Sequence, residues 1–337
     1  MSLTDAELGE RARALHRDSI VLDAHSDILM ALTDGEASWE DAAPPATATE
    51  AGCAGQVSLP LLRAGGVTAQ VFAIFTAPYG LDYRVVRPEY AGAVLPRALA
   101  MLATFHEALA RYPDQLRLAT TAAEIRRAKQ DGVVAGILGV EGLDPIGHDL
   151  RLLRVLRSLG VTLVSLTWSN PNPLADGSSS ARHPGGLTWL GEEAVRELER
   201  LRILIDLAHL GPAATDELLE LARRPLIHSH ARASNPEQER MLRRLGEGGG
   251  VACAIFYRIP SVGALVDDLE RLMQLCGPRG AGLGADFYGT LNAPHEVRSV
   301  AGYPRITEEL LRRGHDDDTV RGILGENVLR LYQQVVG

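Results

Sequence analysis

The chain has 337 residues, with 46% hydrophobic and 23% charged content, which is typical of a globular protein that buries a large core. Its formal net charge is −9 and it has no Lys/Arg run, so we expect no nucleic-acid partner. Its single lysine, Lys129, excludes a GxxxxGK[ST] phosphate loop, and its polar, helix-like surroundings argue against a Schiff base or a carbamate bridge between metals.

The cysteines and the N-terminal segment predict the compartment. Cys53, Cys253 and Cys276 are widely spaced without a CxxC pair, which favours a reducing environment over a disulfide framework. Residues 1–17 are charged and lack the apolar core of a signal peptide, and no apolar run approaches about 18 residues. We therefore expect a cytoplasmic protein without a membrane partner.

Strand-like apolar runs alternate with helix-like segments. Before residue 133 we expect helices at 4–16, 91–111 and 121–130, strands at 20–28 and 67–75, a loop insertion at 34–58 and an irregular segment at 77–89. Thr120 and Thr121, together with Glu124, resemble a capping box at the start of the third helix.

From residue 133 onward the alternation is regular. We expect strands at 133–140, 161–166, 203–207, 225–230, 251–256 and 281–287, and helices at 150–159, 192–201, 213–223, 236–246, 262–275, 305–313 and 317–335. Eight strands alternating with helices predict a parallel α/β sheet, and polar residues at many strand ends favour a closed (β/α)₈ TIM barrel. Such a barrel needs about 250 residues, so we expect a single domain at 1–337 with loop insertions.

Residue types that bind divalent metals follow five of these strands, where the loops at the top of a barrel meet. They are His25, Asp27, Glu141, His209, His230 and Asp286. His25 and Asp27 are two apart, so on a strand both face the lumen and can hold one cation, unless they only form turn hydrogen bonds. Glu141 is either a structural acceptor or a ligand whose two oxygens bridge two cations.

The candidate residues later in the chain can also be either metal-site residues or purely structural ones. His209 and His230 end consecutive strands, and are either ligands of a second cation or core histidines. His228 shares the face of His230 in a strand and is interpreted as an internal hydrogen-bonding residue. Asp286 can take a proton from a metal-bound water and pass it to a leaving amine, or it caps the next segment. Imidazole and carboxylate ligands without thiolates suit Zn²⁺ best, with Mn²⁺, Fe²⁺ or Co²⁺ as alternatives.

Together these residues resemble the membrane dipeptidase (renal dipeptidase) family of the amidohydrolase superfamily, as a soluble bacterial-type member. The resemblance rests on motifs spread in order over nearly the whole chain: Asp23-Ala24-His25-Ser26-Asp27 (D-x-H-x-D), Gly139-Val140-Glu141-Gly142, Ile205-Asp206-Leu207-Ala208-His209, Ile227-His228-Ser229-His230, Gly282-Leu283-Gly284-Ala285-Asp286-Phe287 and Gly325-Glu326-Asn327-Val328-Leu329-Arg330.

The resemblance implies a (β/α)₈ barrel with two Zn²⁺ ions and hydrolysis of dipeptides, including those with a C-terminal D-residue. It assigns one metal to His25 and Asp27, the other to His209 and His230, and the bridging position to Glu141. In the implied mechanism a bridging water attacks the peptide carbonyl while Asp286 shuttles the proton. Dimers are common in the family, so a homodimer is expected.

Two departures from the family pattern concern substrate contacts. Trp168 stands where the family often has a histidine, and it either contacts the substrate or only packs at the barrel mouth. The segment after His230 is shortened, which leaves Arg232 as the candidate clamp for the substrate carboxylate. Tyr257 matches a family position near that carboxylate, or simply packs.

These departures keep other functions open. A related hydrolase could act on another small amide, such as an N-acyl amino acid or a lactam, and would then process substrates without a free C-terminal carboxylate. A metal-binding barrel without turnover would load metal and hydrolyse no amide. A phosphoesterase is disfavoured, because nothing in the sequence resembles a phosphate cradle.

Overall fold

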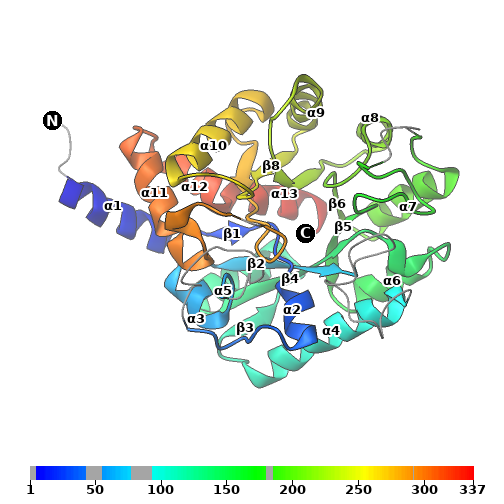
Figure 1. Ribbon diagram of the computed structural model, residues 1–337, viewed down its shortest axis with the longest axis horizontal. Coiled ribbons are helices and arrows are strands. Elements are labelled where there is room, and N and C mark those ends of the chain that lie inside the picture. The colour runs from blue at the N-terminus through cyan, green and yellow to red at the C-terminus, as the bar shows by residue number, and fades with distance from the viewer. Residues whose placement is uncertain (1–4, 43–54, 77–92, 180–184, 291) are drawn as a thin grey trace.

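A closed barrel of eight parallel strands forms the centre of the computed structural model, which describes residues 5–42, 55–76, 93–179, 185–290 and 292–337 (Figure 1). The barrel strands are β1 (Leu22–Asp23), β2 (Ala69–Phe75), β4 (Val134–Glu141), β5 (Val161–Ser165), β6 (Leu204–Asp206), β7 (Ile227–Ala231), β8 (Val251–Ala254) and β9 (Ala281–Leu283). Each pairs in parallel with its neighbours, and the β2–β4 and β1–β9 pairings complete the ring. The predicted TIM barrel is therefore confirmed.

Helices surround the ring in the expected alternation. They are α1 (Asp5–Asp18), α2 (Ile28–Asp34), α3 (Leu59–Ala64), α4 (Val94–Arg111), α5 (Ala122–Asp131), α6 (Leu152–Ser158), α7 (Trp189–Arg200), α8 (Pro212–Leu221), α9 (Pro236–Glu247), α10 (Val262–Cys276), α11 (Pro304–Arg312), α12 (Asp317–Arg321) and α13 (Asn327–Val335). None of the described helices combines the length and the apolar character needed to cross a bilayer.

Local capping explains where several helices begin. The Thr121 hydroxyl accepts a hydrogen bond from the Glu124 N–H, while Glu124 in turn accepts one from the N–H of Thr120. Asn235 caps α9 by accepting from the N–H of Gln238, with a proline at the first helical position. The caps at Thr121 and Asn235 satisfy N–H groups that a helix leaves unpaired at its start. The predicted contacts of Thr120, Thr121 and Glu124 are present, but Glu124 binds the N–H of Thr120, one residue before the cap, and not that of Thr121 as in a regular capping box.

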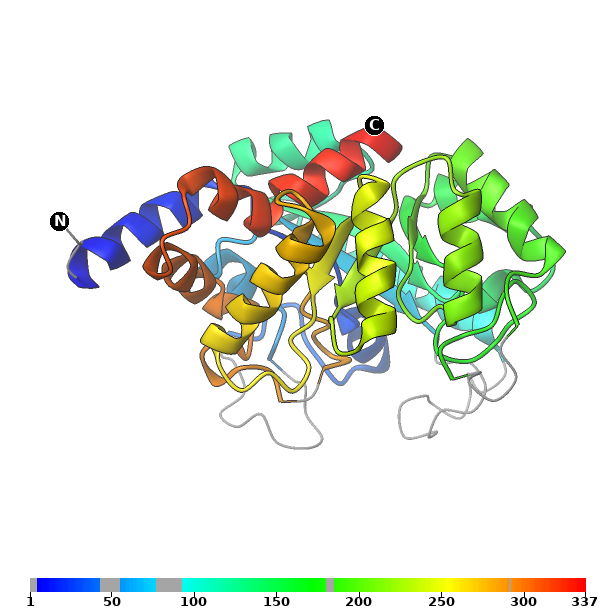
Figure 2. The same cartoon turned by 90° about the horizontal axis from the view of Figure 1, so that it is seen from above.

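The two ends of the barrel differ in character. Helix α13 covers the end where the strands begin, and the Tyr332 hydroxyl donates to Thr162 at the start of β5 (2.6 Å). The opposite end carries α2 and the segment after β9 (Figure 2). The carboxyl ends of the strands open there, which is where TIM-barrel enzymes place their active sites.

Four local predictions were wrong. The strand expected at 20–28 is only two residues long and gives way to α2 at Ile28, and α3 was not predicted. A short additional strand, β3 (Leu116–Leu118), pairs with the first half of β4. The helix expected at 317–335 is interrupted by a π-helical turn at Gly322–Glu326. About half of the predicted loop insertion at 34–58 (residues 43–54) and all of the segment at 77–89 lie outside the described residues.

Candidate metal centre

Six of the predicted site residues come together at the mouth of the barrel. The Nε2 atom of His25 lies 3.6 Å from an Asp27 oxygen, 3.6 Å from a Glu141 oxygen and 3.9 Å from an Asp286 oxygen. The His209 and His230 rings meet at their Nε2 atoms, 2.8 Å apart. Residues separated by up to 261 positions thus present their metal-binding atoms to one small volume.

Glu141 occupies the middle of this cluster. Its Oε1 atom lies 2.8 Å from the Nε2 of His209, 3.8 Å from that of His230 and 3.6 Å from that of His25. The side chain is only 4% exposed. It comes from the last residue of the eight-residue strand β4, which pairs on both sides and holds its end firmly in the sheet.

The ligand atoms form two overlapping groups. Those of His25, Glu141 and His230 lie within 4.8 Å of one another, as do those of His25, Asp27 and Asp286. Asp286 therefore lies where it can contact a cation as well as a reacting water. His25 belongs to both groups.

Backbone strain marks two of the site residues. His209 has a φ of 63° and Asp286 a φ of 59°, both in the left-handed region. Non-glycine residues there cost about 1–3 kcal/mol each and persist only where the surroundings hold them. The strain lets both side chains turn into the barrel mouth directly after a strand.

Serine hydroxyls contact the far ring nitrogens of two histidines. Ser169 lies 3.1 Å from the Nδ1 of His209, and Ser229 lies 2.8 Å from the Nδ1 of His230. A contact at Nδ1 orients the ring and leaves Nε2 directed at the cluster, as in metal-binding histidines.

Burial and mutual interactions shift the pKa values of the clustered residues. Burial opposes charge on His25, but the carboxylates of Glu141, Asp27 and Asp286 outweigh it and raise the pKa of His25 well above its usual value. Burial and the neighbouring charge of Asp27 raise the pKa of Asp286 well above its usual value. Burial also lowers the pKa of His230 well below its usual value, which favours the neutral ring that binds metals.

The donor set fits divalent cations. Both ring nitrogens of His25 and Oδ1 of Asp27 are buried without a hydrogen-bond partner among the described residues. Buried polar atoms normally have partners, so atoms without one in a dense carboxylate–imidazole cluster point to a missing ion. His25, Asp27, Glu141, His209 and His230 would hold it, and their nitrogen and oxygen atoms suit Zn²⁺ or a similar metal.

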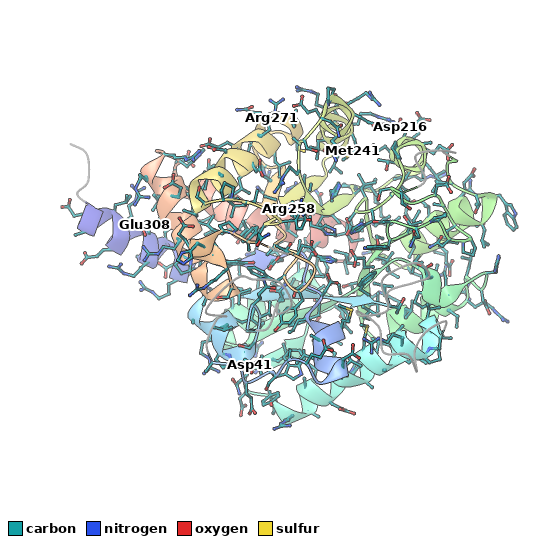
Figure 3. All side chains as sticks on the ribbon, viewed as in Figure 1. Asp41, Asp216, Met241, Arg258, Arg271 and Glu308 are labelled. Atoms are coloured by element: carbon teal, nitrogen blue, oxygen red, sulfur yellow. The ribbon has the colours of Figure 1, made fainter. Side chains whose placement is uncertain are left out.

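A cavity of about 510 Å³ opens beside His209 and His230 and extends between α8 and α9. Asp216 and Met241, labelled in Figure 3, line it from α8 and α9 respectively. Arg232 and Tyr257 also line it, so these two predicted substrate contacts lie beside the metal cluster. The cavity is large enough for a small organic substrate.

Arg232 already has partners in the protein. Its guanidinium lies 3.3 Å from an Asp268 oxygen on α10 and donates to the Tyr257 carbonyl. Trp168 packs between Phe75 and His209, with ring centroids 5.3 Å and 5.7 Å away, and is not among the cavity-lining residues. Trp168 thus flanks His209, one of the candidate metal ligands.

His228 lines the same cavity as His230, and the two ring centroids lie 6.3 Å apart with their planes nearly perpendicular. Its Nδ1 atom is buried without a hydrogen-bond partner among the described residues, so the internal hydrogen bond that was expected is not made at that atom. The pairing of β7 with β8 shifts register between His228 and Ala231. Burial lowers the pKa of His228 to about 4.

Four residues close to the ligands were missed. Ser169 and Ser229 contact ring nitrogens, and the buried carboxylates of Asp23 and Asp206 accept backbone N–H bonds beside the ligands. The sequence carried a signal for three of them: an aspartate two or three residues before a histidine, and a serine immediately before His230. Ser169 had no such signal, because it is brought to His209 from 40 residues away.

Comparisons with known proteins agree with this geometry. The family model of membrane dipeptidase (peptidase family M19) matches residues 9–336. Dipeptidase aclJ of Aspergillus oryzae is 30% identical over 306 residues, covering 83% of this chain and 70% of that protein. Dipeptidase 3 of Mus musculus is 28% identical over 355 residues, covering 98% and 68%.

Solved structures show the same fold. A metallopeptidase from Rhodobacter sphaeroides, liganded with a phosphinate mimic of the dipeptide L-Ala-D-Ala, is 25% identical with a TM-score of 0.82. The similarity covers 94% of this chain and 100% of that one. Because the family model spans almost every residue, and the metal-type residues cluster at the barrel mouth, the chain belongs to the membrane dipeptidase family.

Proposed function

We propose that this protein hydrolyses dipeptides with the help of two divalent cations, zinc foremost, held at the barrel mouth. The observation that carries the proposal is the convergence of three imidazoles and three carboxylates, some with buried atoms that have no hydrogen-bond partner in the described part of the chain. The similarity to proteins named dipeptidases, and to a metallopeptidase that holds a dipeptide mimic, supports a dipeptide as the substrate.

The proposed ligand roles follow the distances. His25 and Asp27 would hold one cation, His209 and His230 the other, and Glu141, whose oxygen lies near all three histidines, would bridge them. When bound, the cations would supply an acidified water and polarise the scissile carbonyl. The serine contacts at the Nδ1 atoms of His209 and His230 keep both rings oriented with Nε2 toward the site.

Asp286 is proposed as the proton carrier. Its Oδ2 accepts a hydrogen bond from the Thr290 hydroxyl (3.2 Å), while Oδ1 points toward His25. As a carboxylate, Asp286 can take a proton from the attacking water, and once protonated it can release that proton to the departing amine. Burial and the neighbouring charge of Asp27 raise its pKa, which helps it hold the proton between the two transfers. A carboxylate with a raised pKa is suited to both roles near neutral pH.

The cavity beside His209 is proposed to receive the C-terminal part of the dipeptide. Arg232 and Tyr257 lie on its wall and would contact the substrate carboxylate, while Trp168 would contact the substrate next to His209. A substrate of the L-Xaa-D-Xaa type is included, because the Rhodobacter metallopeptidase holds a mimic of L-Ala-D-Ala.

One observation favours a second candidate, a hydrolase of the same family type acting on another amide such as an N-acyl amino acid. Arg232 is already held by Asp268 and the Tyr257 carbonyl, which limits its freedom to clamp a carboxylate. Such an enzyme would cleave amides without a free C-terminal carboxylate as well as dipeptides.

The test is amino-acid release from a library of L-L and L-D dipeptides and their C-terminal amides, using zinc-loaded and chelator-stripped protein in parallel. Cleavage of dipeptides that is lost on stripping and restored by zinc supports the proposal. Equal rates on dipeptides and their amides favour the second candidate, and no cleavage by fully loaded protein rejects both.

A further inference from the structure

Two buried aspartates, Asp23 and Asp206, make the same pair of contacts at two places in the barrel. Oδ1 of Asp23 accepts hydrogen bonds from the N–H of His25 (3.2 Å) and of Ala285 (3.0 Å). Oδ1 of Asp206 accepts from the N–H of Ala208 (3.0 Å) and of Ser229 (2.9 Å). Each carboxylate thus binds its own chain two residues on and the neighbouring strand.

The contacts of Asp23 replace a backbone bond of the sheet. The Ala24 N–H donates to the Leu283 carbonyl, so a regular parallel ladder would direct the Ala285 N–H to the carbonyl of Ala24. That N–H instead donates to Asp23, and the next backbone bond runs from Asp286 to the His25 carbonyl. The register shifts at the point where His25 and Asp286 enter the site.

Asp206 replaces a backbone acceptor in the same way between β6 and β7. The Leu207 N–H donates to the Ile227 carbonyl, so the Ser229 N–H would regularly bond the carbonyl of Leu207. It donates to Asp206 instead, beside the register shift of β7. His209 and His230 follow directly after the two N–H groups that Asp206 binds.

We propose that Asp23 and Asp206 are positioning residues that set the geometry of the metal ligands. Each carboxylate takes the place of a strand carbonyl as acceptor, which satisfies the N–H groups that an irregular ladder would leave unpaired. The chain can then leave strand geometry and turn two site residues into the mouth. Asp23 positions His25 and Asp286, and Asp206 positions His209 and His230.

This inference rests on the proposed metal binding but not on the proposed reaction. A residue that merely filled space would not need its acceptor oxygen at one position. Asparagine keeps a carbonyl oxygen with two lone pairs at that position, whereas glutamate keeps the charge and moves the oxygens by one methylene. At Asp206 the two substitutions therefore separate acceptor position from charge. At Asp23 asparagine also loses the hydrogen bond that the Tyr303 hydroxyl donates to Oδ2, so Asp206 provides the deciding comparison.

The experiment uses the full chain with Asp206→Asn, Asp206→Glu and the control Leu204→Ala. Leu204 is fully buried on the same strand, facing the lumen one layer below Asp206. Chelator-stripped proteins are titrated with Zn²⁺ in a calorimeter, bound metal is counted, and thermal unfolding is recorded without metal. Asp23→Asn and Asp23→Glu are measured in the same way.

We expect Asp206→Glu to weaken Zn²⁺ binding at one of two sites by about 10- to 100-fold, the usual effect of disturbing groups behind metal ligands. Asp206→Asn should stay close to the unsubstituted protein, and Leu204→Ala should lower the melting temperature while binding Zn²⁺ normally. Asp23→Glu should weaken the other site.

Three results would overturn the inference: normal Zn²⁺ binding by Asp206→Glu, equal losses in Asp206→Asn and Asp206→Glu, or a loss in Leu204→Ala as large as in Asp206→Glu. Because the deciding readout is metal binding and none of the readouts is activity, the inference can stand even if no dipeptide is cleaved. Conversely, if the protein cleaves dipeptides but its Zn²⁺ affinity does not change in these variants, the proposed function stands and the positioning role is rejected.

Discussion

Gly289 lies against two site carboxylates from the segment after β9, although its position is exposed to solvent. A Cβ atom added there would lie 2.5 Å from Oδ2 of Asp27 and even closer to Oδ1 of Asp286. Real Cβ contacts below 3.0 Å are essentially never seen. The substitution Gly289→Ala must therefore move at least one of these carboxylates or the backbone that carries residue 289.

The size of the effect follows from this geometry. Raising the Asp27 contact from 2.5 Å to the shortest tolerated 3.0 Å requires a shift of half an ångström, and the Asp286 contact requires more. Since a misplacement of about 1 Å can cost about 100-fold in rate, we expect kcat to fall by roughly 10- to 100-fold. An exposed glycine replaced by alanine would otherwise leave stability nearly unchanged.

The assay measures kcat on a good dipeptide, bound zinc and the melting temperature for Gly289→Ala. The control is Gly263→Ala on α10, where an added Cβ would meet no atom closer than 3.6 Å. The control should keep normal activity and a melting temperature at least as high as that of the parent. Unchanged kcat in Gly289→Ala, with normal zinc, would refute the reasoning that this glycine keeps the two carboxylates in place.

Three further substitutions have defined outcomes. Asp286→Asn should retain zinc but lose most turnover, and parent-like rates would remove Asp286 from the proton transfer. Arg232→Ala should raise KM for dipeptides much more than for C-terminal amides, whereas an equal effect on both would reject the clamp. The hydrogen bond from Arg200, together with Arg154, lowers the pKa of Glu197 from its ordinary 4.5 to about 2. The ionised Glu197 therefore stabilises the folded protein above pH 4.5, and this stabilisation is lost as the pH falls toward 2. Glu197→Gln should thus cost about 1 kcal/mol in urea unfolding at pH 7, reduced by solvent screening, and progressively less below pH 4.5; a constant difference would contradict the assignment.

The order of the barrel strands was predictable because each is a short apolar run between polar helices. The elements that escaped prediction are short or depend on distant partners. Helix α3 has six residues and strand β3 has three, and β3 is stabilised by pairing with the first half of β4. Strand β1 was overestimated because the polar stretch after it continues the apparent strand pattern, whereas Asp23 bends the chain there.

The sequence by itself determined the fold class and the identity of the residues that meet at the mouth, because ligand chemistry and strand order are both properties of the local sequence. Only the tertiary structure decided how those residues face one another. The left-handed backbone of His209 and Asp286, the partners of Arg232 and the register shift beside His228 all depend on packing between segments distant in sequence. Such shifts involve hydrogen bonds between segments more than 20 residues apart, as for Asp206 with Ser229 and Asp23 with Ala285, and the local sequence identifies the aspartates but not the distant N–H groups that they bind.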